Sequence, residues 1–208
     1  MKKLLFFILF IPICVFASDS NNFTVDIPED MIEVDTNSNY YKWIYKDKEL
    51  PSITVIQEEN KNYNIDLFDE EDILNYENYI ENELNNEMKE YDINIDVYDS
   101  EIISINERNS LVYYTKWDTM DSYGYDTYQK IFVFTTKSYL STVTFSAKSE
   151  EEINSELFNN VIESFVINDE DIIIENNTDK FIIMFAIIGA LLGFILSLII
   201  FKKRRKKL

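Results

Sequence analysis

The sequence contains no histidine, one cysteine, and only three glycines and three prolines. Without histidine the chain cannot form a Ser-His-Asp triad, a Cys-His dyad or a histidine-ligated zinc site, and one cysteine excludes an intrachain disulfide and a Cys-ligated zinc centre. Basic residues are also scarce, at 19 against 38 acidic ones, so the basic footprint of a nucleic-acid-binding protein is missing. We therefore expect a protein that is not an enzyme and has no cofactor, no metal site and no nucleic-acid partner.

Apolar and acidic residues are abundant instead. Hydrophobic residues make up 46% of the chain and aromatic residues 15%, which is enough to build a folded core. The acids lie between residues 18 and 180, where 38 acidic and 11 basic residues give a net charge of −27. Such a segment is highly soluble and is repelled by anionic lipid, and it favours a cationic partner over an anionic one.

Residues 1–17 have the pattern of a signal peptide. Two lysines precede an apolar stretch at residues 4–16, and Ala17 supplies the small residue before the predicted cleavage. About 13 apolar residues are too few to cross a hydrocarbon core of ~30 Å comfortably. The alternatives are an uncleaved anchor and a lipoprotein signal at Cys14, but Ile13 stands where lipidation requires a small residue.

Residues 181–201 are uncharged and apolar, and they predict one transmembrane helix. At 1.5 Å per residue this segment spans about 31 Å, and it lacks the polar face of a buried core helix. Residues 202–208 are basic and predict a cytoplasmic tail, so residues 18–168 should form an extracellular domain joined to the cell membrane by an acidic stalk at 169–180.

The predicted membrane span carries a small-residue pattern. Gly189 and Gly193 form a GxxxG motif, and Ser197 extends it by four residues. Small residues on one helix face allow two helices to approach closely, so this pattern is typical of a transmembrane dimer. It also occurs by chance, and a monomeric span is the alternative.

Residues 18–168 show the alternating pattern of half-buried strands between two helical segments. Strands are predicted at 23–27, 41–45, 53–56, 93–97, 103–105, 111–115, 131–134 and 140–145. A helix is predicted where apolar residues recur at spacings of three and four, namely at Ile73, Tyr76, Ile80, Leu84 and Met88. Asp69 is its predicted N-cap, and Ser149 with Glu152 predicts a capping box at the start of a second helix that reaches Phe165. This order predicts an α+β fold, an antiparallel sheet with helices packed on it.

Several phrases resemble PsbP-like domains. The segment Phe23-Thr-Val-Asp-Ile-Pro28 is similar to the first strand of that family, and Phe132-Val-Phe with Glu163-Ser-Phe165 is similar to its C-terminal half. The resemblance covers about residues 20–168 and implies an α-β-α sandwich. Glu29-Asp30-Met31 departs from the Gly-Trp type of turn that often follows the first proline. The family has no shared catalytic motif, so the resemblance implies no catalytic residue.

Residues 117–128, WDTMDSYGYDTY, predict a loop between two strands. Aromatic faces interleaved with carboxylates suit stacking on a sugar or holding a cationic group. The residues that we expect to contact such a ligand are Trp117, Asp118, Asp121, Tyr123, Tyr125 and Asp126. The alternative is a long hairpin whose aromatic side chains pack on the edge of the sheet.

Two acidic segments fit ordinary secondary structure better than they fit calcium binding. Residues 92–99 alternate acids as an EF-hand loop does, but Val97 stands where such a loop requires glycine, and the apolar alternation predicts a strand. Residues 66–72 contain five acids that suit the start of a helix. We therefore expect calcium, magnesium and sodium to stabilise the domain alike at equal ionic strength.

These features together predict an extracytoplasmic binding or sensing module that is anchored by one membrane pass. Its ligand outside the membrane should be a protein, a carbohydrate or a cationic group. The alternative is a structural or accessory subunit of a membrane complex in the cell envelope.

Overall fold

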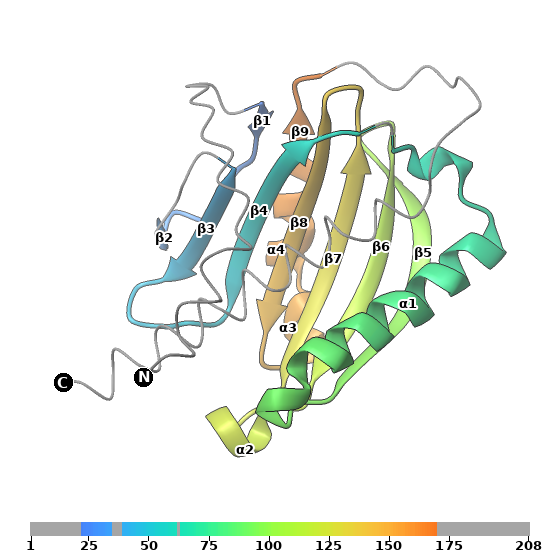
Figure 1. Cartoon of the computed structure of the whole chain (residues 1–208). Coiled ribbons are helices and arrows are strands. Elements are labelled where there is room, and N and C mark those ends of the chain that lie inside the picture. Colours follow the sequence, from blue (N-terminus) through green and yellow to red (C-terminus); the bar gives the residue numbers. More distant parts are fainter. Residues whose placement is uncertain (1–21, 35–38, 62, 170–208) are drawn as a thin grey trace, which may run out of the picture.

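The computed structural model describes residues 22–34, 39–61 and 63–169, which form a seven-stranded antiparallel sheet with helices on both faces (Figure 1). The strands, in their order across the sheet, are β2 (Met31–Glu33), β3 (Tyr40–Tyr45), β4 (Ser52–Glu59), β8 (Tyr139–Ala147), β7 (Thr127–Thr135), β6 (Arg108–Trp117) and β5 (Ile95–Ile105). β5 is therefore an edge strand, paired along one side only with β6.

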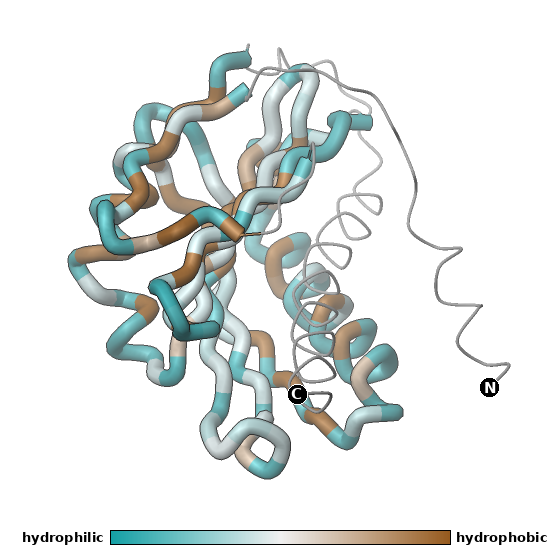
Figure 2. Tube along the Cα trace, turned by 90° about the vertical axis from the view of Figure 1, so that its left-hand side faces the viewer, coloured by the Kyte–Doolittle hydropathy of each residue, from teal (hydrophilic) through white to brown (hydrophobic). Residues whose placement is uncertain are grey.

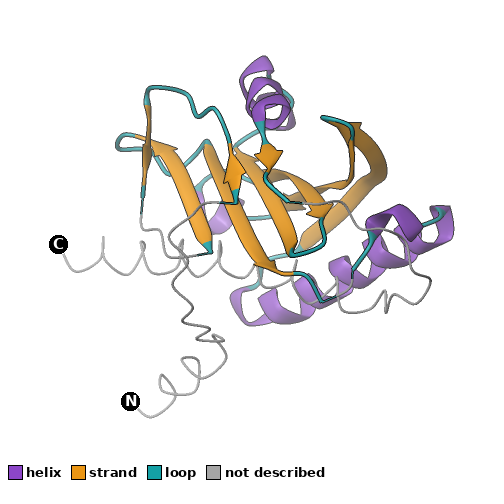
Figure 3. Ribbon diagram, turned by 90° about the horizontal axis from the view of Figure 1, so that it is seen from above, coloured by secondary structure: helices purple, strands orange, loops and turns teal. Residues whose placement is uncertain are grey.

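The long helix α1 (Glu70–Met88) covers one face of the sheet, and α3 (Glu150–Ile153) and α4 (Glu156–Ser164) cover the other (Figures 1 and 3). Two shorter elements precede and follow α1, the 3₁₀ turns η1 (Ile65–Leu67) and η2 (Lys89–Tyr91). A four-residue helix, α2 (Met120–Tyr123), lies in the β6–β7 connection. The arrangement is the α+β architecture expected from the sequence.

Each face of the sheet has its own hydrophobic core. Alternation along β6 sends Leu111 and Tyr113 to the α1 side and Val112 to the α3–α4 side. The α1 side chains buried in the first core are Tyr76, Ile80, Leu84 and Met88. Figure 2 shows hydrophobic positions recurring along α1 between hydrophilic ones, as the predicted stripe requires.

The ends of both predicted helices test the capping assignments. Asp69 accepts the backbone N–H of Asp72, and Asp72 accepts that of Asp69, so a full capping box begins α1. Ser149 likewise accepts the N–H of Glu152, but the Glu152 carboxylate accepts the N–H of Lys148 rather than that of Ser149. The second predicted helix is also broken, because α3 ends before Asn154 and α4 begins at Glu156.

The chain ends of the domain pair with each other instead of joining the main sheet. The predicted strand 23–27 is shorter, β1 (Phe23–Thr24), and it pairs with β9 (Val166–Ile167) in a separate two-stranded sheet. Phe23 packs against Phe165 with ring centroids 5.4 Å apart, which fixes this pairing over the α3–α4 core. The segments 93–97 and 103–105, predicted as separate strands, join in one long strand, β5.

Several predictions concern residues outside the described ranges. They are the signal peptide at 1–17, nearly all of the stalk at 169–180, the membrane span at 181–201 with Gly189, Gly193 and Ser197, and the tail at 202–208. Among the described residues, no helix combines the length and apolar character needed to cross a membrane.

Candidate functional site

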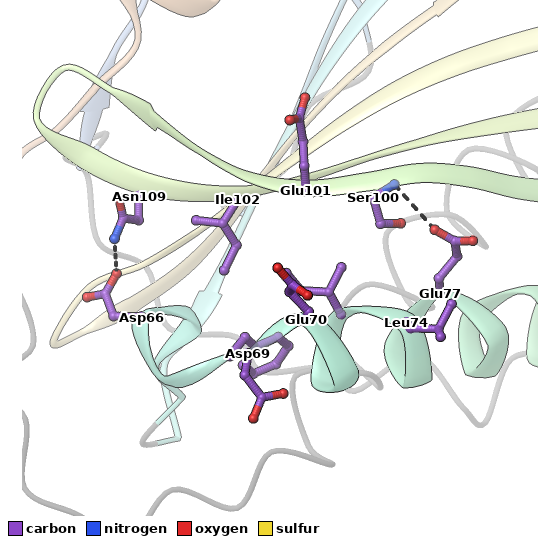
Figure 4. Close-up of a pocket in the computed structure, with 11 residues that line it drawn as sticks. Asp66, Asp69, Glu70, Leu74, Glu77, Ser100, Glu101, Ile102 and Asn109 are labelled. Atoms are coloured by element: carbon purple, nitrogen blue, oxygen red, sulfur yellow. Dashed lines mark hydrogen bonds between the residues drawn. The ribbon is translucent and has the colours of Figure 1, made fainter.

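A groove of about 700 Å³ lies between the start of α1 and the outer edge of β5 (Figure 4). Its acidic lining residues are Asp66, Asp69, Glu70, Glu77 and Glu101. Its apolar lining residues are Phe68, Ile73, Leu74 and Ile102. Ser100 and Asn109 complete the lining, so the groove has an apolar interior, an acidic rim and no basic residue among the described ones.

One end of the groove is fixed by η1 and the start of α1. Asn64 caps η1 by accepting the N–H of Asp66, and the Asp66 carboxylate accepts the side-chain N–H of Asn109 at 2.7 Å. This contact ties the turn to β6, as the dashed line in Figure 4 shows. Three acids follow Asp69 in the first turn of α1, where the positive end of the helix dipole stabilises them.

Beyond the groove, side chains of α1 bind the outer edge of β5. The Asn85 amide accepts the N–H of Ile95 at 2.8 Å and donates to its carbonyl at 2.7 Å. Glu81 accepts the N–H of Val97 at 2.9 Å. These bonds satisfy backbone groups that an edge strand otherwise leaves unpaired.

The periods of helix and strand explain this register. Four helical residues rise about 6.0 Å and two strand residues about 6.7 Å, so every fourth residue of α1 meets every second residue of β5. Glu77 continues the series and accepts the N–H of Ser100 at 3.3 Å. A β-bulge between Tyr98 and Glu101, with Asp99 at a φ of 53°, accounts for the extra residue in that step.

The series ends at the groove, because the next residue four positions back on α1 is Ile73, a hydrocarbon side chain. Ile73 and Ile102 instead contribute to the apolar interior of the groove. Leu74 leaves 57% of its side chain exposed beside them. In Figure 4 the side chains of Ser100 and Ile102 point toward α1, whereas Glu101 points away from it.

Two kinds of polar group in the groove have no partner among the described residues. The Glu70 and Glu101 carboxylates have no hydrogen-bond or ion-pair partner among the described residues. The Ser100 hydroxyl is sheltered from solvent and likewise has no hydrogen-bond partner among them. A ligand with positive charge and hydrogen-bonding groups would satisfy both.

The structure places the six ligand-binding residues predicted in the 117–128 loop in different environments. Trp117 is only 2% exposed and lies in the α1-side core, where its indole N–H donates to Thr115 Oγ1 and Gln129 Oε1. Its ring faces are therefore covered by core residues and are not available for stacking on a ligand. Asp118 and Asp121 are exposed on the surface of the loop.

Of the other three predicted loop residues, Tyr125 and Asp126 lie near cations of the chain itself. Tyr123 and Tyr125 form a tilted ring pair with centroids 6.2 Å apart, and Lys148 lies 4.2 Å from the Tyr125 centroid. Asp126 forms an ion pair with Lys116 at 3.5 Å. Burial, and secondarily the negative charge of Glu49, raises the pKa of Tyr123. Lysines outside the loop thus already lie beside Tyr125 and Asp126, where the predicted ligand would place its cation, and ligand binding there stays a prediction.

The two acidic segments behave as expected from their patterns. Most of segment 92–99 belongs to β5, which confirms the strand assignment, and the acids of 66–72 lie in η1 and at the start of α1, where Asp69 and Asp72 form the capping box. Within the described ranges no three His, Cys, Asp or Glu side chains come together as a metal site.

Glu77, Glu81 and Asn85 are not among the residues predicted to have a role. A signal for them is present in the sequence, because three polar residues repeat every four positions directly beside the apolar stripe of α1. Recognising their role also requires knowing that β5 is an edge strand, which depends on the strand order.

Comparison with known proteins identifies the fold. The chain matches no protein-family profile and no curated protein. Among solved structures it is similar to the cyanobacterial PsbP protein CyanoP from Synechocystis, with a TM-score of 0.51 and 14% identity over 73% of this chain and 90% of that one. The fold is therefore PsbP-like, and at this identity the likeness extends to the fold alone.

Two further matches are weaker. A Bacteroides thetaiotaomicron protein gives a TM-score of 0.47 and 12% identity over 73% of this chain, and the chain spans 47% of its length. The Ran-binding protein Mog1p of Saccharomyces cerevisiae gives a TM-score of 0.45 and 8% identity, covering 71% of this chain and 91% of that one.

Proposed function

We propose that this protein is a membrane-anchored extracytoplasmic binding module without catalytic activity, and that it binds its partner in the groove between α1 and β5. The observation that carries the proposal is the groove itself, which joins an apolar interior, an acidic rim and an open strand edge. The lack of histidine in the whole chain supports a binding role over the common acid–base and nucleophilic chemistries.

The proposed location rests on the two ends of the sequence. Residues 1–17 would direct export and be removed, residues 181–201 would anchor the chain, and the basic residues 202–208 would hold that end in the cytoplasm. The folded domain with its net negative charge would then face outward and be held away from anionic headgroups by repulsion.

A second candidate is an accessory subunit of an envelope membrane complex. The small-residue pattern of Gly189, Gly193 and Ser197 favours it, since such a face packs against another transmembrane helix. In this case the membrane span, rather than the groove, would make the principal contact.

Protease added to intact cells tests the location. With a tag after residue 208, we expect digestion of the domain and survival of the tagged tail. Digestion of the tail with survival of the domain would contradict the proposed topology.

Purification from detergent-solubilised membranes separates the two candidates. A protein that elutes without a stoichiometric membrane partner supports the binding module. A stoichiometric membrane partner that is lost in a Gly189→Leu, Gly193→Leu variant, while the domain stays folded, supports the accessory subunit.

A further inference from the structure

We propose that the groove receives an extended, cationic segment of a protein partner, which adds to the open edge of β5 as an eighth strand at Ile102 and Ser104. This inference rests on the proposed binding function and specifies the chemical class of the partner. Strand addition at an exposed sheet edge is a common mode of peptide recognition, in which backbone hydrogen bonds give affinity and alternate side chains give specificity.

The hairpin turn fixes which backbone groups of β5 point outward. Asn106 and Glu107 both have positive φ, at 50° and 68°, and form the two-residue turn between β5 and β6. The residues flanking such a turn, Ile105 and Arg108, form a hydrogen-bonded pair. Because the pattern alternates along an antiparallel strand, Ile102 and Ser104 direct their N–H and C=O groups away from β6.

The hydrogen bonds of the other half of β5 support this assignment. The outward groups of Ile95, Val97 and Ser100 are bound by Asn85, Glu81 and Glu77 of α1. No described residue does the same for Ile102 or Ser104, because the series reaches Ile102 at Ile73, a hydrocarbon side chain, and reaches Ser104 at Asp69, which caps α1. The groove lies where this series of bonds stops.

The side chains around the open edge define what the added strand should carry. Phe68, Ile73 and Leu74 offer apolar contact on the α1 side, and the half-buried Ile102 offers it from β5. A strand lying there would point every second side chain at this surface. Its remaining side chains would point to the opposite face, where Glu101 points away from α1, so lysine or arginine fits those positions, and Glu70 at the start of α1 adds negative charge on the other side.

Charge and existing contacts favour a polypeptide over other ligands. The acidic rim repels nucleic acid and anionic lipid. A metal ion would need several carboxylates, but Asp66, Asp69 and Glu77 already accept hydrogen bonds from the protein. The groove then offers an open backbone edge and two unpaired carboxylates. A cationic strand would form hydrogen bonds with the edge and ion pairs with the carboxylates.

The test uses the full chain in dodecyl maltoside micelles and three fluorescent peptides followed by anisotropy. The first is a blocked octapeptide of alternating lysine and valine. The second has the same sequence with N-methyl groups on every second peptide bond along one edge, made in both registers. The third carries glutamate in place of lysine. We expect saturable binding of the first, at least tenfold weaker binding of the N-methylated register whose methyl groups lie on the edge facing β5, nearly unchanged binding of the other register, and no binding of the third.

Two pairs of variants locate the site. Ser104→Pro removes an outward N–H and leaves the β6 ladder intact, so it should weaken binding at least tenfold, whereas Ser104→Ala retains the N–H and should bind as the unmodified chain does. Glu70→Lys should weaken binding at least fivefold, and the matched charge reversal Glu156→Lys, on α4 behind the sheet, should change it less than twofold.

Three outcomes overturn the inference. Equal binding of the unmethylated peptide and of both N-methylated registers would show attraction by charge alone. Binding that persists in Ser104→Pro and is lost in Tyr125→Ala would move the site to the 117–128 loop and leave the binding module standing. If no peptide binds but protease digestion places the domain outside the cell, the strand-addition inference alone is wrong. If digestion shows the reverse topology, the proposed function is wrong.

Discussion

The two halves of β5 differ in what lies against their outer edge. From Ile95 to Ser100 the outward backbone N–H groups are bound by side chains of α1, whereas the outward groups of Ile102, which lines the groove, and of Ser104 are bound by no described residue. The strand, its neighbour β6 and the helix are the same in both halves. The difference arises from one residue in the series that repeats every four positions along α1. Asn85, Glu81 and Glu77 are polar, but the next residue toward the N-terminus is Ile73.

This contrast shows how a helix can close a sheet edge. An unpaired edge invites pairing with another chain, and proteins block it with charges, bulges or a covering element. Here α1 uses an amide and two carboxylates as substitutes for the backbone of a further strand. Where those substitutes stop, the edge regains its capacity to pair.

The largest effect should come from removing the double contact of Asn85. Asn85→Ala leaves the N–H and C=O of Ile95, a residue with 0% exposure, without partners, and we expect a loss of about 2–4 kcal/mol of unfolding free energy. Urea unfolding measures it. The matched control is Asn82→Ala, whose side chain bonds only its own helix, and its effect should stay within about 0.5 kcal/mol.

Alkaline pH should destabilise the hydrophobic core between α1 and the sheet through its buried tyrosines. Burial raises the pKa of Tyr76, on α1, and of Tyr113, on β6 beneath it, well above the usual value of 10. The folded state therefore keeps protons that the unfolded chain releases above pH 10, so stability is complete below that pH and falls as pH rises. At pH 11 the loss is about 1.4 kcal/mol for each tyrosine.

Tyr113→Phe should remove one of these contributions, so its unfolding free energy should fall less between pH 9 and pH 11. Urea unfolding across that range measures the slope. The surface substitution Tyr91→Phe, on a side chain that is 42% exposed, controls for the loss of a tyrosine hydroxyl as such. A Tyr113→Phe variant with an unchanged slope would contradict the explanation.

Glu81 tests whether the carboxylates act as acceptors or only as charges. Glu81→Ala should cost about 1 kcal/mol by leaving the N–H of Val97 unpaired, and Glu81→Gln, which keeps an acceptor oxygen, should cost less than half of that. Glu77→Ala should cost less than Glu81→Ala because its bond is longer, at 3.3 Å. Equal losses in Glu81→Ala and Glu81→Gln would assign the effect to charge.

The smallest effect should come from the open half. Leu74 is 57% exposed, and Leu74→Ser should change the unfolding free energy by less than about 0.5 kcal/mol. The same variant should bind the lysine–valine peptide more weakly, because an apolar contact is lost. A large destabilisation would show that Leu74 belongs to the core of the domain rather than to a binding surface.

The fold was predictable where periodicity is strong. The stripe from Tyr76 to Met88 and the strands around Phe132 and Phe145 follow directly from their spacing, and Asp69 caps α1 as its position indicates. The pairing of β1 with β9 was not predictable, because Phe23 alternates as a strand residue in either sheet.

The groove could not be predicted, because it depends on three facts that are distant in sequence. β5 must be an edge strand, α1 must cross it, and a bulge must set the register between them. The composition of the 117–128 loop predicts a ligand site, yet Trp117 lies in the core, where its indole N–H donates to Gln129. Composition identifies unusual residues, while exposure depends on tertiary packing.

Amide hydrogen exchange along β5, resolved residue by residue, tests the contrast between its two halves most directly. The amides of Ile95 and Val97 should exchange only with opening of the domain, since α1 binds them, whereas those of Ile102 and Ser104 should exchange at least a hundredfold faster. Protection of Ile102 and Ser104 equal to that of Ile95 and Val97 would show that the edge is closed throughout, and it would contradict the account.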